Sequence, residues 1–382
     1  MRQVLFLIVL FTFSIANYAT GGENQDLNVS KTTVEEELNV KELILEHLAD
    51  SYEWHLFNTK KNSVTIHLPV ILYSKTSGWN IFLSSKLHNN DNNYKGFGIA
   101  TEGKYKGKIV ETSSSGEEVR PFDLSITKNA ASLLLSSLIL ILIILGVSQS
   151  IKRDPLKPKK GFAGIMEMFI LMIVDEVIKP AIGEDYKRYS PYLLTLFFFI
   201  FFNNLLGLFP LFPGGANVTG NISVTLVLAI GTFLVINLTG TNKYYKDILW
   251  PDTPVWLKVP FPLMQIIELV GTLTKPFALM IRLFANIMAG HAIVLGLTSL
   301  VFVTVSLGSA INASMSVVSV IFTVFIDFVE LLVAFIQAYV FTLLSSVFIG
   351  LAREEEPKND KKELALEKLT ELVNHLEIKK EI

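Results

Sequence analysis

The stretch Lys275-Pro-Phe-Ala-Leu-Met-Ile-Arg282-Leu-Phe-Ala-Asn-Ile-Met-Ala-Gly-His291 decides the fold, because it places a cation in the middle of a long apolar segment, residues 261–306. Between residues 259 and 352 the fully charged residues are few: Glu268, Lys275, Arg282, Asp327 and Glu330. A charge near the bilayer centre costs about 2.5–3.5 kcal/mol, so such residues face protein or water and have a function there. The stretch therefore predicts a membrane helix with a working polar face.

The spacing of these polar residues divides the helix into two sides. Glu268, Lys275 and Arg282 recur every seven residues, and a heptad drifts by only about 20° on an α-helix, so they form one stripe. Asn286 extends the stripe by a turn, whereas His291 falls on nearly the opposite side. A fixed cation on one side and a titratable imidazole on the other would suit a charge barrier between two aqueous compartments.

Length and composition indicate a polytopic membrane protein with a soluble part. The chain has 382 residues, of which 51% are hydrophobic, with a mean hydropathy of +0.46. Several uncharged runs exceed the length that crosses a bilayer. The absence of cysteine excludes disulfides, thiolate metal sites and cysteine nucleophiles. We expect no metal and no cofactor, and the net charge of -2 does not indicate a partner.

The N-terminus has the features of an export signal. Arg2 precedes an apolar core, residues 4–13, and small residues follow it, with cleavage expected after Ala16 or Ala19. Residues 1–19 are therefore predicted to be a cleaved signal peptide, and the alternative is an uncleaved anchor. The signal peptide would place residues 20–128 outside the cytoplasm.

Residues 20–128 predict a small soluble α+β extension. Residues 33–51 have helical periodicity in Val34, Leu38, Leu43, Ile44 and Leu48, with acidic residues in the first turns. Alternating runs at residues 63–73, 79–83, 97–101 and 108–111 predict strands. The spacing of the histidines in this region does not indicate a metal site.

The first membrane segment, residues 129–151, is uncharged and is followed at once by a cluster of lysine and arginine, residues 152–160. The positive-inside rule places this cluster in the cytoplasm. The next segment, residues 162–182, carries Glu167, Asp175, Glu176 and Lys179 mainly on one side. We expect an amphipathic helix at the cytoplasmic surface that ends at Pro180 and Gly183, and the alternative is a sixth span.

A hairpin of two spans is predicted next, at residues 191–208 and 222–238, because prolines and glycines interrupt a long uncharged region between them. Asn203 and Asn204 in the first span and Asn221 at the loop exit are structural polar residues that need partners in lipid.

Two long apolar helices complete the membrane region, which we bound at residues 129–352. Residues 261–306 would span about 69 Å as one helix, so this helix must tilt strongly or break at Pro276 or Gly290. A turn of small residues, 308–316, leads to a second run, 317–351. The fold class expected is an all-α polytopic membrane protein with five crossings and one surface helix, its N-terminus outside and its C-terminus inside.

On the last helix Asp327, Glu330 and Gln337 share a face. Antiparallel pairing around residue 312 places Glu330 at the depth of His291. The two could form a titratable site in a proton relay, or they could merely neutralise each other. Residues 353–382 form a charged tail that ends in an amphipathic helix, 361–380, either solvated or docked on a partner.

Four motifs resemble subunit a of the rotary F-type ATP synthase membrane sector, the stator channel against which the c-ring turns. They are Arg-Leu-Phe-Ala-Asn-Ile-Met-Ala-Gly-His at 282–291, Phe-Phe-Asn-Asn-Leu-Leu-Gly-Leu-Phe-Pro at 201–210, Thr-Gly-Asn-Ile-Ser-Val-Thr at 219–225 and Gln-Ala-Tyr-Val-Phe at 337–341. The resemblance covers roughly residues 130–352 in the order and spacing of the family. The extension and the tail depart from it.

The resemblance implies roles for the polar residues. Arg282 takes the place of the essential arginine, which separates two aqueous half-channels and pairs with the rotor carboxylate. Glu268, Lys275, Asn286 and Gln337 match conserved positions on the last two helices. His291 and Glu330 form a pair in the order opposite to that of many bacterial relatives. Protons would enter past this pair and leave near Glu268, and the two long helices would lie strongly inclined along the ring.

The same resemblance implies a non-catalytic subunit, multi-pass in the bacterial inner membrane, whose partners are the c-ring, the peripheral stalk b subunits, the rest of the ATP synthase and membrane lipid, but no nucleic acid. The chain has no Walker A loop. The coupling ion, proton or sodium, stays open. A secondary transporter with an intramembrane charged site is the alternative, although the halves show no inverted repeat. An intramembrane hydrolase would need a His-Glu-x-x-His run or a nucleophile in a recognisable setting.

Overall fold

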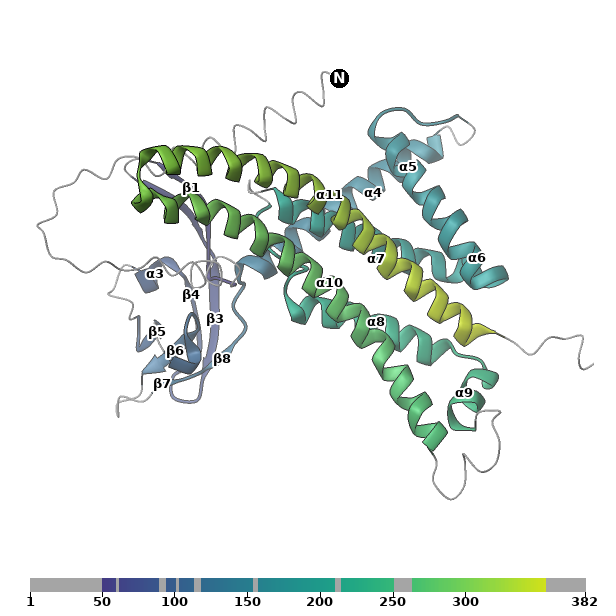
Figure 1. Ribbon diagram of the computed structural model, residues 1–382. Coiled ribbons are helices and arrows are strands. Elements are labelled where there is room, and N and C mark those ends of the chain that lie inside the picture. The colour runs from purple at the N-terminus through teal and green to yellow at the C-terminus, as the bar shows by residue number, and fades with distance from the viewer. Residues whose placement is uncertain are drawn as a thin grey trace, which may run out of the picture. The chain divides into compact units, whose positions relative to one another are not determined.

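The computed structural model describes residues 50–59, 62–88, 94–100, 103–112, 118–153, 157–209, 214–250 and 263–354. The predicted signal peptide, nearly all of the helix predicted at 33–51 and the tail helix at 361–380 lie outside these residues. A small strand-rich region precedes a mostly helical region with five helical stretches long and apolar enough to cross a membrane (Figure 1). The predicted fold class is confirmed.

Three small antiparallel sheets build the N-terminal extension. The first pairs β1 with β2, the second has the strand order β4-β3-β8, and the third has the order β5-β6-β7. The strands are β1 (Glu53–Thr59), β2 (Asn62–His67), β3 (Pro69–Ser74), β4 (Gly78–Leu83), β5 (Phe97–Ile99), β6 (Ile109–Thr112), β7 (Glu118–Val119) and β8 (Phe122–Asp123). A short helix, α3 (Ser85–His88), and a 3-10 turn, η1 (Gly103–Tyr105), lie between strands.

The extension has its own hydrophobic core, made by side chains that alternate inward along the strands. Its buried members are Tyr52, Val70, Leu72, Phe82, Leu87, Phe97 and Ile109. The hairpin that enters β5 turns at Lys95 and Gly96, which both have positive φ, 55° and 83°. Such a turn matches the twist of paired strands, and glycine adopts it without strain.

The sequence located the strands only in part. The run predicted at 63–73 is two strands, β2 and β3, separated at Leu68, and β1, β7 and β8 were missed. Strands β7 and β8 are two residues long each, too short to give an alternating pattern. Their place is decided by pairing with β6 and β3.

The membrane region consists of long helices. In chain order these are α4 (Lys128–Arg153), α5 (Phe162–Met172), the π-helical segment η2 (Ile173–Ile178), α6 (Lys179–Ile182), the 3-10 turn η3 (Gly183–Asp185), α7 (Tyr186–Leu208), α8 (Ile222–Thr239), α9 (Asn242–Leu249), α10 (Leu263–Val303), the 3-10 turn η5 (Thr304–Leu307) and α11 (Ser309–Arg353). The short helix α9 was not predicted, and Thr241 caps its N-terminus by accepting from the amide of Tyr244.

The segment predicted as a surface helix differs from the expectation in how it ends. Pro180 does not stop it, because the proline stands in the first turn of α6, where its missing N–H is tolerated. The wide π turn η2 precedes this proline. The helical run ends at Gly183, whose φ of 76° is easy only for glycine. Whether the segment lies at the membrane surface stays a prediction.

The two last helices differ from the prediction in their bounds: α10 is slightly shorter than the predicted 261–306, and α11 is longer than the predicted 317–351. Helix α10 continues through Pro276 and Gly290 for 41 residues, so of the two alternatives, a strong tilt or a break, the break is absent from the described residues 263–303. Neighbouring helices can satisfy the backbone carbonyl that a membrane proline leaves free. The predicted turn at 308–316 is wrong in extent: Gly308, with a φ of 104°, makes the turn, and α11 begins at Ser309. The 41 residues of α10 measure about 61 Å, which exceeds the hydrocarbon thickness of about 30 Å and requires tilt.

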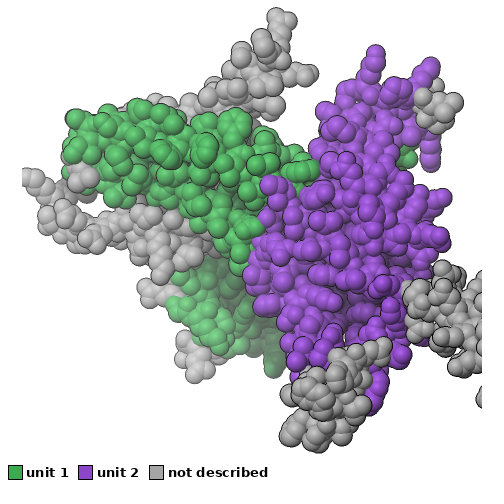
Figure 2. Space-filling view, turned by 45° about the vertical axis from the view of Figure 1, so that its right-hand side comes forward, with its two compact units in different colours: residues 1–148, 199–221, 284–335 green, residues 149–198, 222–283, 336–382 purple. Residues whose placement is uncertain are grey.

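The chain divides into two compact units (Figure 2). Unit 1 comprises residues 1–148, 199–221 and 284–335, and unit 2 comprises residues 149–198, 222–283 and 336–382. The boundary passes through α4, α7, α10 and α11, so each unit contains parts of these helices. Among the predicted site residues, Arg282 belongs to unit 2, whereas His291 and Glu330 belong to unit 1.

Candidate functional site

In unit 2, α10 and α11 border an open groove of about 300 Å³. Its lining combines two cations with small and apolar side chains: Thr274, Lys275, Ala278, Leu279, Arg282, Leu344 and Phe348. The groove follows from the sequence because Ala278 lies one turn from Arg282 on the same face and leaves room beside it. No carboxylate contributes to the lining.

Arg282 lies on an exposed face of α10. Within the part of the chain that the structure describes, no hydrogen bond or ion pair holds its guanidinium. Arginine keeps its charge in proteins and presents a rigid fork of donors that fits a carboxylate. An unpaired guanidinium in an apolar helix is costly, so the geometry calls for an acidic group from another molecule.

Lys275 shares the groove but differs from Arg282 in its surroundings. Its ammonium lies 5.5 Å from the centre of the Phe348 ring, a cation–π contact between α10 and α11. The remaining members of the predicted stripe are Glu268, which is half-buried, and Asn286, which is exposed. The stripe expected from the heptad spacing is therefore a largely open face of α10.

In unit 1, Glu330 on α11 packs directly against Gly290 on α10. A β-carbon at residue 290 would collide with the Glu330 carboxylate, so glycine is what allows the approach. The carboxylate oxygen Oε1 is buried and has no hydrogen-bond partner among the described residues. Such a group is costly unless a proton or a water satisfies it. Asp327, one turn earlier, is half-buried.

His291 follows Gly290, so its backbone lies beside the residue that Glu330 contacts. Its ring atom Nε2 is 3.8 Å from the place that a β-carbon on Gly207 of α7 would occupy. Three helices of unit 1 thus converge where two glycines leave space. No hydrogen bond or ion pair within the described ranges joins His291 to Glu330. The role of the two as a proton relay stays a prediction.

Two of the three asparagines predicted to need partners, Asn203 and Asn204, are buried and hydrogen-bonded, although Oδ1 of Asn204 has no partner among the described residues. Asn203 accepts from the Ser136 hydroxyl of α4 at 2.8 Å and donates to the Phe199 carbonyl at 2.8 Å. Asn204 donates to the Ala334 carbonyl of α11 at 3.2 Å. These bonds tie α7 to two other helices inside unit 1. Ser136 is not among the predicted site residues; its signal in the sequence is that Ser132 and Ser136 stand one turn apart in an apolar run.

The other two predicted polar residues are Asn221, just before α8, and Gln337, on α11. The backbone N–H of Asn221 donates a hydrogen bond to the Val218 carbonyl at 3.2 Å. Gln337 on α11 is only 7% exposed and lies in unit 2. Near it in sequence, α11 has a run of buried hydroxyl residues, Thr342, Ser345 and Ser346. Their small size favours close helix packing.

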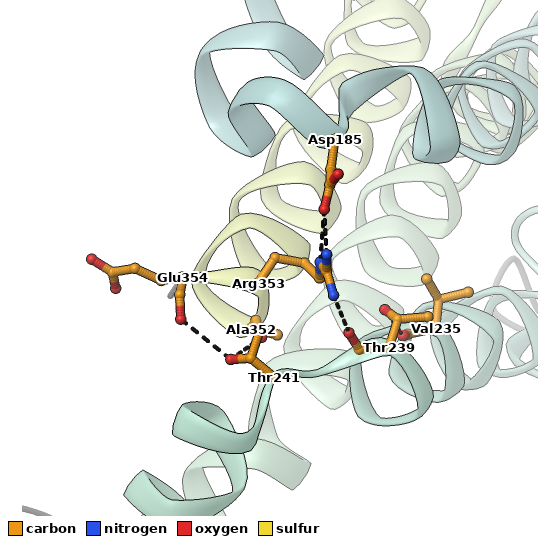
Figure 3. A network of polar contacts seen from close by, with 7 residues as sticks. All are labelled: Asp185, Val235, Thr239, Thr241, Ala352, Arg353 and Glu354. Atoms are coloured by element: carbon orange, nitrogen blue, oxygen red, sulfur yellow. Dashed lines mark hydrogen bonds and ion pairs between the residues drawn. The ribbon is translucent and has the colours of Figure 1, made fainter. Parts of the chain in front are cut away.

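An ion pair that the sequence did not predict holds the end of α11 (Figure 3). Arg353 donates from Nε to Asp185 Oδ2 at 3.1 Å, and from Nη1 to the Thr239 carbonyl at 3.4 Å. Beside it, the Thr241 amide donates to the Ala352 carbonyl at 2.9 Å. The pair therefore connects η3, α8 and α11. The signal in the sequence for this pair is a cation, Arg353, at the end of a long apolar run.

Comparisons with known proteins agree with this architecture. A family model described as ATP synthase A chain matches residues 131–350, and one described as Domain of unknown function (DUF8433) matches residues 43–130. The chain is 43% identical over 254 residues to ATP synthase subunit a 2 of Chlorobaculum tepidum, covering 65% of this chain and 68% of that protein. It is 41% identical over 249 residues to ATP synthase subunit a of Chloroherpeton thalassium (64% and 71% covered), and 42% identical over 238 residues to that of Myxococcus xanthus (60% and 73%).

Proposed function

Because this chain belongs to the ATP synthase A chain family, the proton-conducting stator subunits of that complex, we propose that Arg282 is the residue that separates its two half-channels. The chain is a non-catalytic, multi-pass subunit in a bacterial membrane, and it works with the other subunits of the complex. The observation that carries the proposal is the exposed guanidinium of Arg282, unpaired within the described residues, in a groove without carboxylates.

The partner that fits Arg282 is a carboxylate on the rotating c-ring. The guanidinium attracts the ionised carboxylate as it enters the groove and repels a free proton. A proton cannot then pass directly between the two aqueous paths and must travel on the ring. One charge moved across 100 mV is worth about 2.3 kcal/mol, and this work drives rotation.

We propose His291, Glu330 and Asp327 as the entry path from outside. The buried oxygen of Glu330, which has no partner among the described residues, supports this role, because leaving it unsatisfied is costly and a bound proton or water would satisfy it. Exit to the cytoplasm would pass Glu268, with Lys275, Asn286 and Gln337 completing the polar lining. The peripheral stalk b subunits are further proposed partners. Asn203, Asn204 and Asn221 have structural roles.

The proposed orientation places residues 20–128 outside and the tail, residues 353–382, in the cytoplasm, with the channel in residues 129–352. The lysines and arginines at the end of α4 support it, because such clusters stay inside. Single cysteines at exposed positions can test this in a chain that has none: we expect Lys152→Cys to react from the cytoplasmic side and Lys104→Cys from the opposite side. Reaction of both from one side would contradict the orientation.

The central test replaces Arg282 by lysine in the assembled complex. We expect Arg282→Lys to abolish ATP-driven proton pumping, because an ammonium cannot reproduce the planar, permanently charged fork. Lys275→Arg is the matched control, since it alters the neighbouring cation of the same groove while keeping its charge. Normal pumping by Arg282→Lys would rule out the assignment, provided that immunoblots show equal amounts of assembled complex.

A further inference from the structure

Helix α4 buries a stripe of polar side chains and exposes its large apolar ones. Three of the four buried residues of this helix are polar, namely Asn129, Ser132 and Ser136. At 100° per residue they fall within an arc of about 60° on one face. Apolar side chains of the same helix, such as Leu134 and Leu138, are 59% and 54% exposed. The side of α4 that packs inside unit 1 is therefore its polar side, as in membrane helices that line a polar interior.

Asn129 begins this stripe with a side-chain oxygen that is not satisfied. The residue is 7% exposed, and its Oδ1 atom is buried without a hydrogen-bond partner among the described residues. Such an atom is costly to bury. Small residues alone would be enough for close helix packing, so packing does not explain an asparagine at this position. A water molecule would satisfy the oxygen, and the stripe thus begins with an acceptor for water.

The other end of the stripe leads to His291 by way of α7. The Ser136 hydroxyl donates to Asn203 Oδ1 at 2.8 Å. Gly207 stands one turn after Asn203 on the same face of α7, and Nε2 of His291 is 3.8 Å from the place of a β-carbon on Gly207. The ammonium of Lys128, the first residue of α4, is close enough to His291 for their charges to interact. The start of α4 and His291 therefore lie in the same part of unit 1.

The N-terminal extension contacts α4 where the stripe begins. The Asp50 carboxylate accepts a hydrogen bond from the Asn129 amide at 3.0 Å, and the Ser51 carbonyl accepts one from the Lys128 amide at 2.8 Å. These bonds satisfy two of the amides that the first turn of a helix leaves free. The charges of Asp50 and Lys128 also interact. The extension thus brings a carboxylate to the first polar residue of the stripe.

Lys128 needs the negative charge that Asp50 supplies. It is partly buried, and it stands in the first turn of α4, where the helix dipole disfavours a cation. Without a counter-charge, its ammonium would also repel protons that approach His291. The carboxylate of Asp50 offsets both effects.

We propose that Asp50 and Asn129 form the mouth of the proton entry path, and that Ser132 lines the path between this mouth and His291. The inference rests on the entry path proposed above and adds that the extension supplies a residue to it. Asp50 is a positioning residue, because it acts by balancing the charge of Lys128. Asn129 and Ser132 hold the water along which protons move inward.

A charge-rescue experiment in the assembled complex tests the role of Asp50. Asp50→Asn removes the charge but keeps an acceptor for the Asn129 amide, because asparagine caps helices as well as aspartate does. In inverted vesicles with an acidic interior, protons enter from the side of the extension and drive ATP synthesis. We expect Asp50→Asn to slow synthesis about threefold or more, since an unbalanced charge acts strongly at a partly buried site. Adding Lys128→Gln to the same chain should restore the rate.

The matched control is Glu118→Gln, which removes one carboxylate from an exposed position on β7 and should not change the rate. A native rate in Asp50→Asn would overturn the proposal. So would a loss that Lys128→Gln does not restore, because a merely structural role of Asp50 does not depend on the charge of Lys128. Glu330→Gln in the same vesicles separates the two proposals: if it slows synthesis and Asp50→Asn does not, the entry path stands and only its mouth is wrong.

Asn129→Leu tests the stripe independently of these charges. Leucine is similar in size and removes the unsatisfied oxygen, so the chain should unfold in detergent at the same temperature as the native chain or at a higher one. We nonetheless expect slower ATP synthesis at equal amounts of complex, because the mouth loses its acceptor for water. A native rate, or a slower rate together with a lower unfolding temperature, would overturn the role of Asn129.

Discussion

Glu330 and Gly290 face each other so closely that the glycine's missing side chain is the space the carboxylate occupies. The two residues belong to consecutive helices, α11 and α10, within unit 1. This contact places a buried, unpaired oxygen next to the backbone of His291. The contact lies on the proposed entry path, and adding one methyl group at Gly290 would disturb it.

Gly290→Ala should displace the Glu330 carboxylate and impair pumping. Overpacking of this kind costs about 1–3 kcal/mol. If this cost is added to the barrier for proton transfer at Glu330, the proton flux falls about fivefold or more. ATP-driven acidification of vesicles measures it. Gly296→Ala is the matched control on the same helix, because a β-carbon there has nothing within 4 Å. Equal activity of the two variants would contradict the prediction.

Glu330→Gln should slow proton flux far more than Asp327→Asn. Both changes keep the size of the side chain and remove one titratable group, but the contact with Gly290 belongs to Glu330. The measurement is the rate of dye quenching in vesicles at equal amounts of complex. Similar losses of proton flux in the two variants would contradict a special role of Glu330 in the entry path.

The pair of Arg353 and Asp185 should stabilise the end of α11 modestly. Their side chains are 23% and 46% exposed, and ion pairs of this kind contribute about 0.2–1 kcal/mol. A double-mutant cycle with Arg353→Gln and Asp185→Asn, read by thermal unfolding of the chain in detergent, gives the coupling. Because Arg353 also donates to the Thr239 carbonyl, Arg353→Gln should cost more than Asp185→Asn. A larger loss of stability in Asp185→Asn than in Arg353→Gln would contradict this prediction and would indicate that Asp185 stabilises the protein through other contacts.

The extension should lose stability at high pH through Tyr52. Burial in the core, with the hydrogen bond to Asp123, raises the pKa of Tyr52 above its ordinary value of about 10. The folded state therefore holds the phenolic proton more tightly than the unfolded state, so stability is complete below pH 10 and falls as the pH rises above it.

Limited proteolysis of the full chain between pH 8 and pH 11 measures this loss. We expect cleavage within the extension to accelerate above about pH 10 in the native chain. Tyr52→Phe lacks the titrating hydroxyl, so its cleavage rate should change less over that interval, although its baseline stability is lower without the bond to Asp123. Parallel pH curves for the two proteins would exclude Tyr52 as the cause.

The sequence by itself determined the membrane architecture and the residues worth testing. Apolar runs longer than a bilayer and their rare charges do not depend on packing, because the cost of a charge in hydrocarbon is a property of the residue. For this reason the five crossings and the stripe with Arg282 could be derived from the residues. The proposed roles of Glu268, Gln337 and Lys275 rest on the family resemblance.

Only the tertiary structure decided which residues the polar side chains contact. Ser136 with Asn203, Glu330 with Gly290 and Arg353 with Asp185 are contacts between segments far apart in the sequence, and no local periodicity contains them. The same holds for helix ends: Pro180 and Pro276 resemble stops, but helices can continue where an N–H is dispensable or neighbours satisfy the freed carbonyl. The exposed apolar side of the sheet β4-β3-β8 is likewise decided by strand register, which places six separate large side chains on one surface.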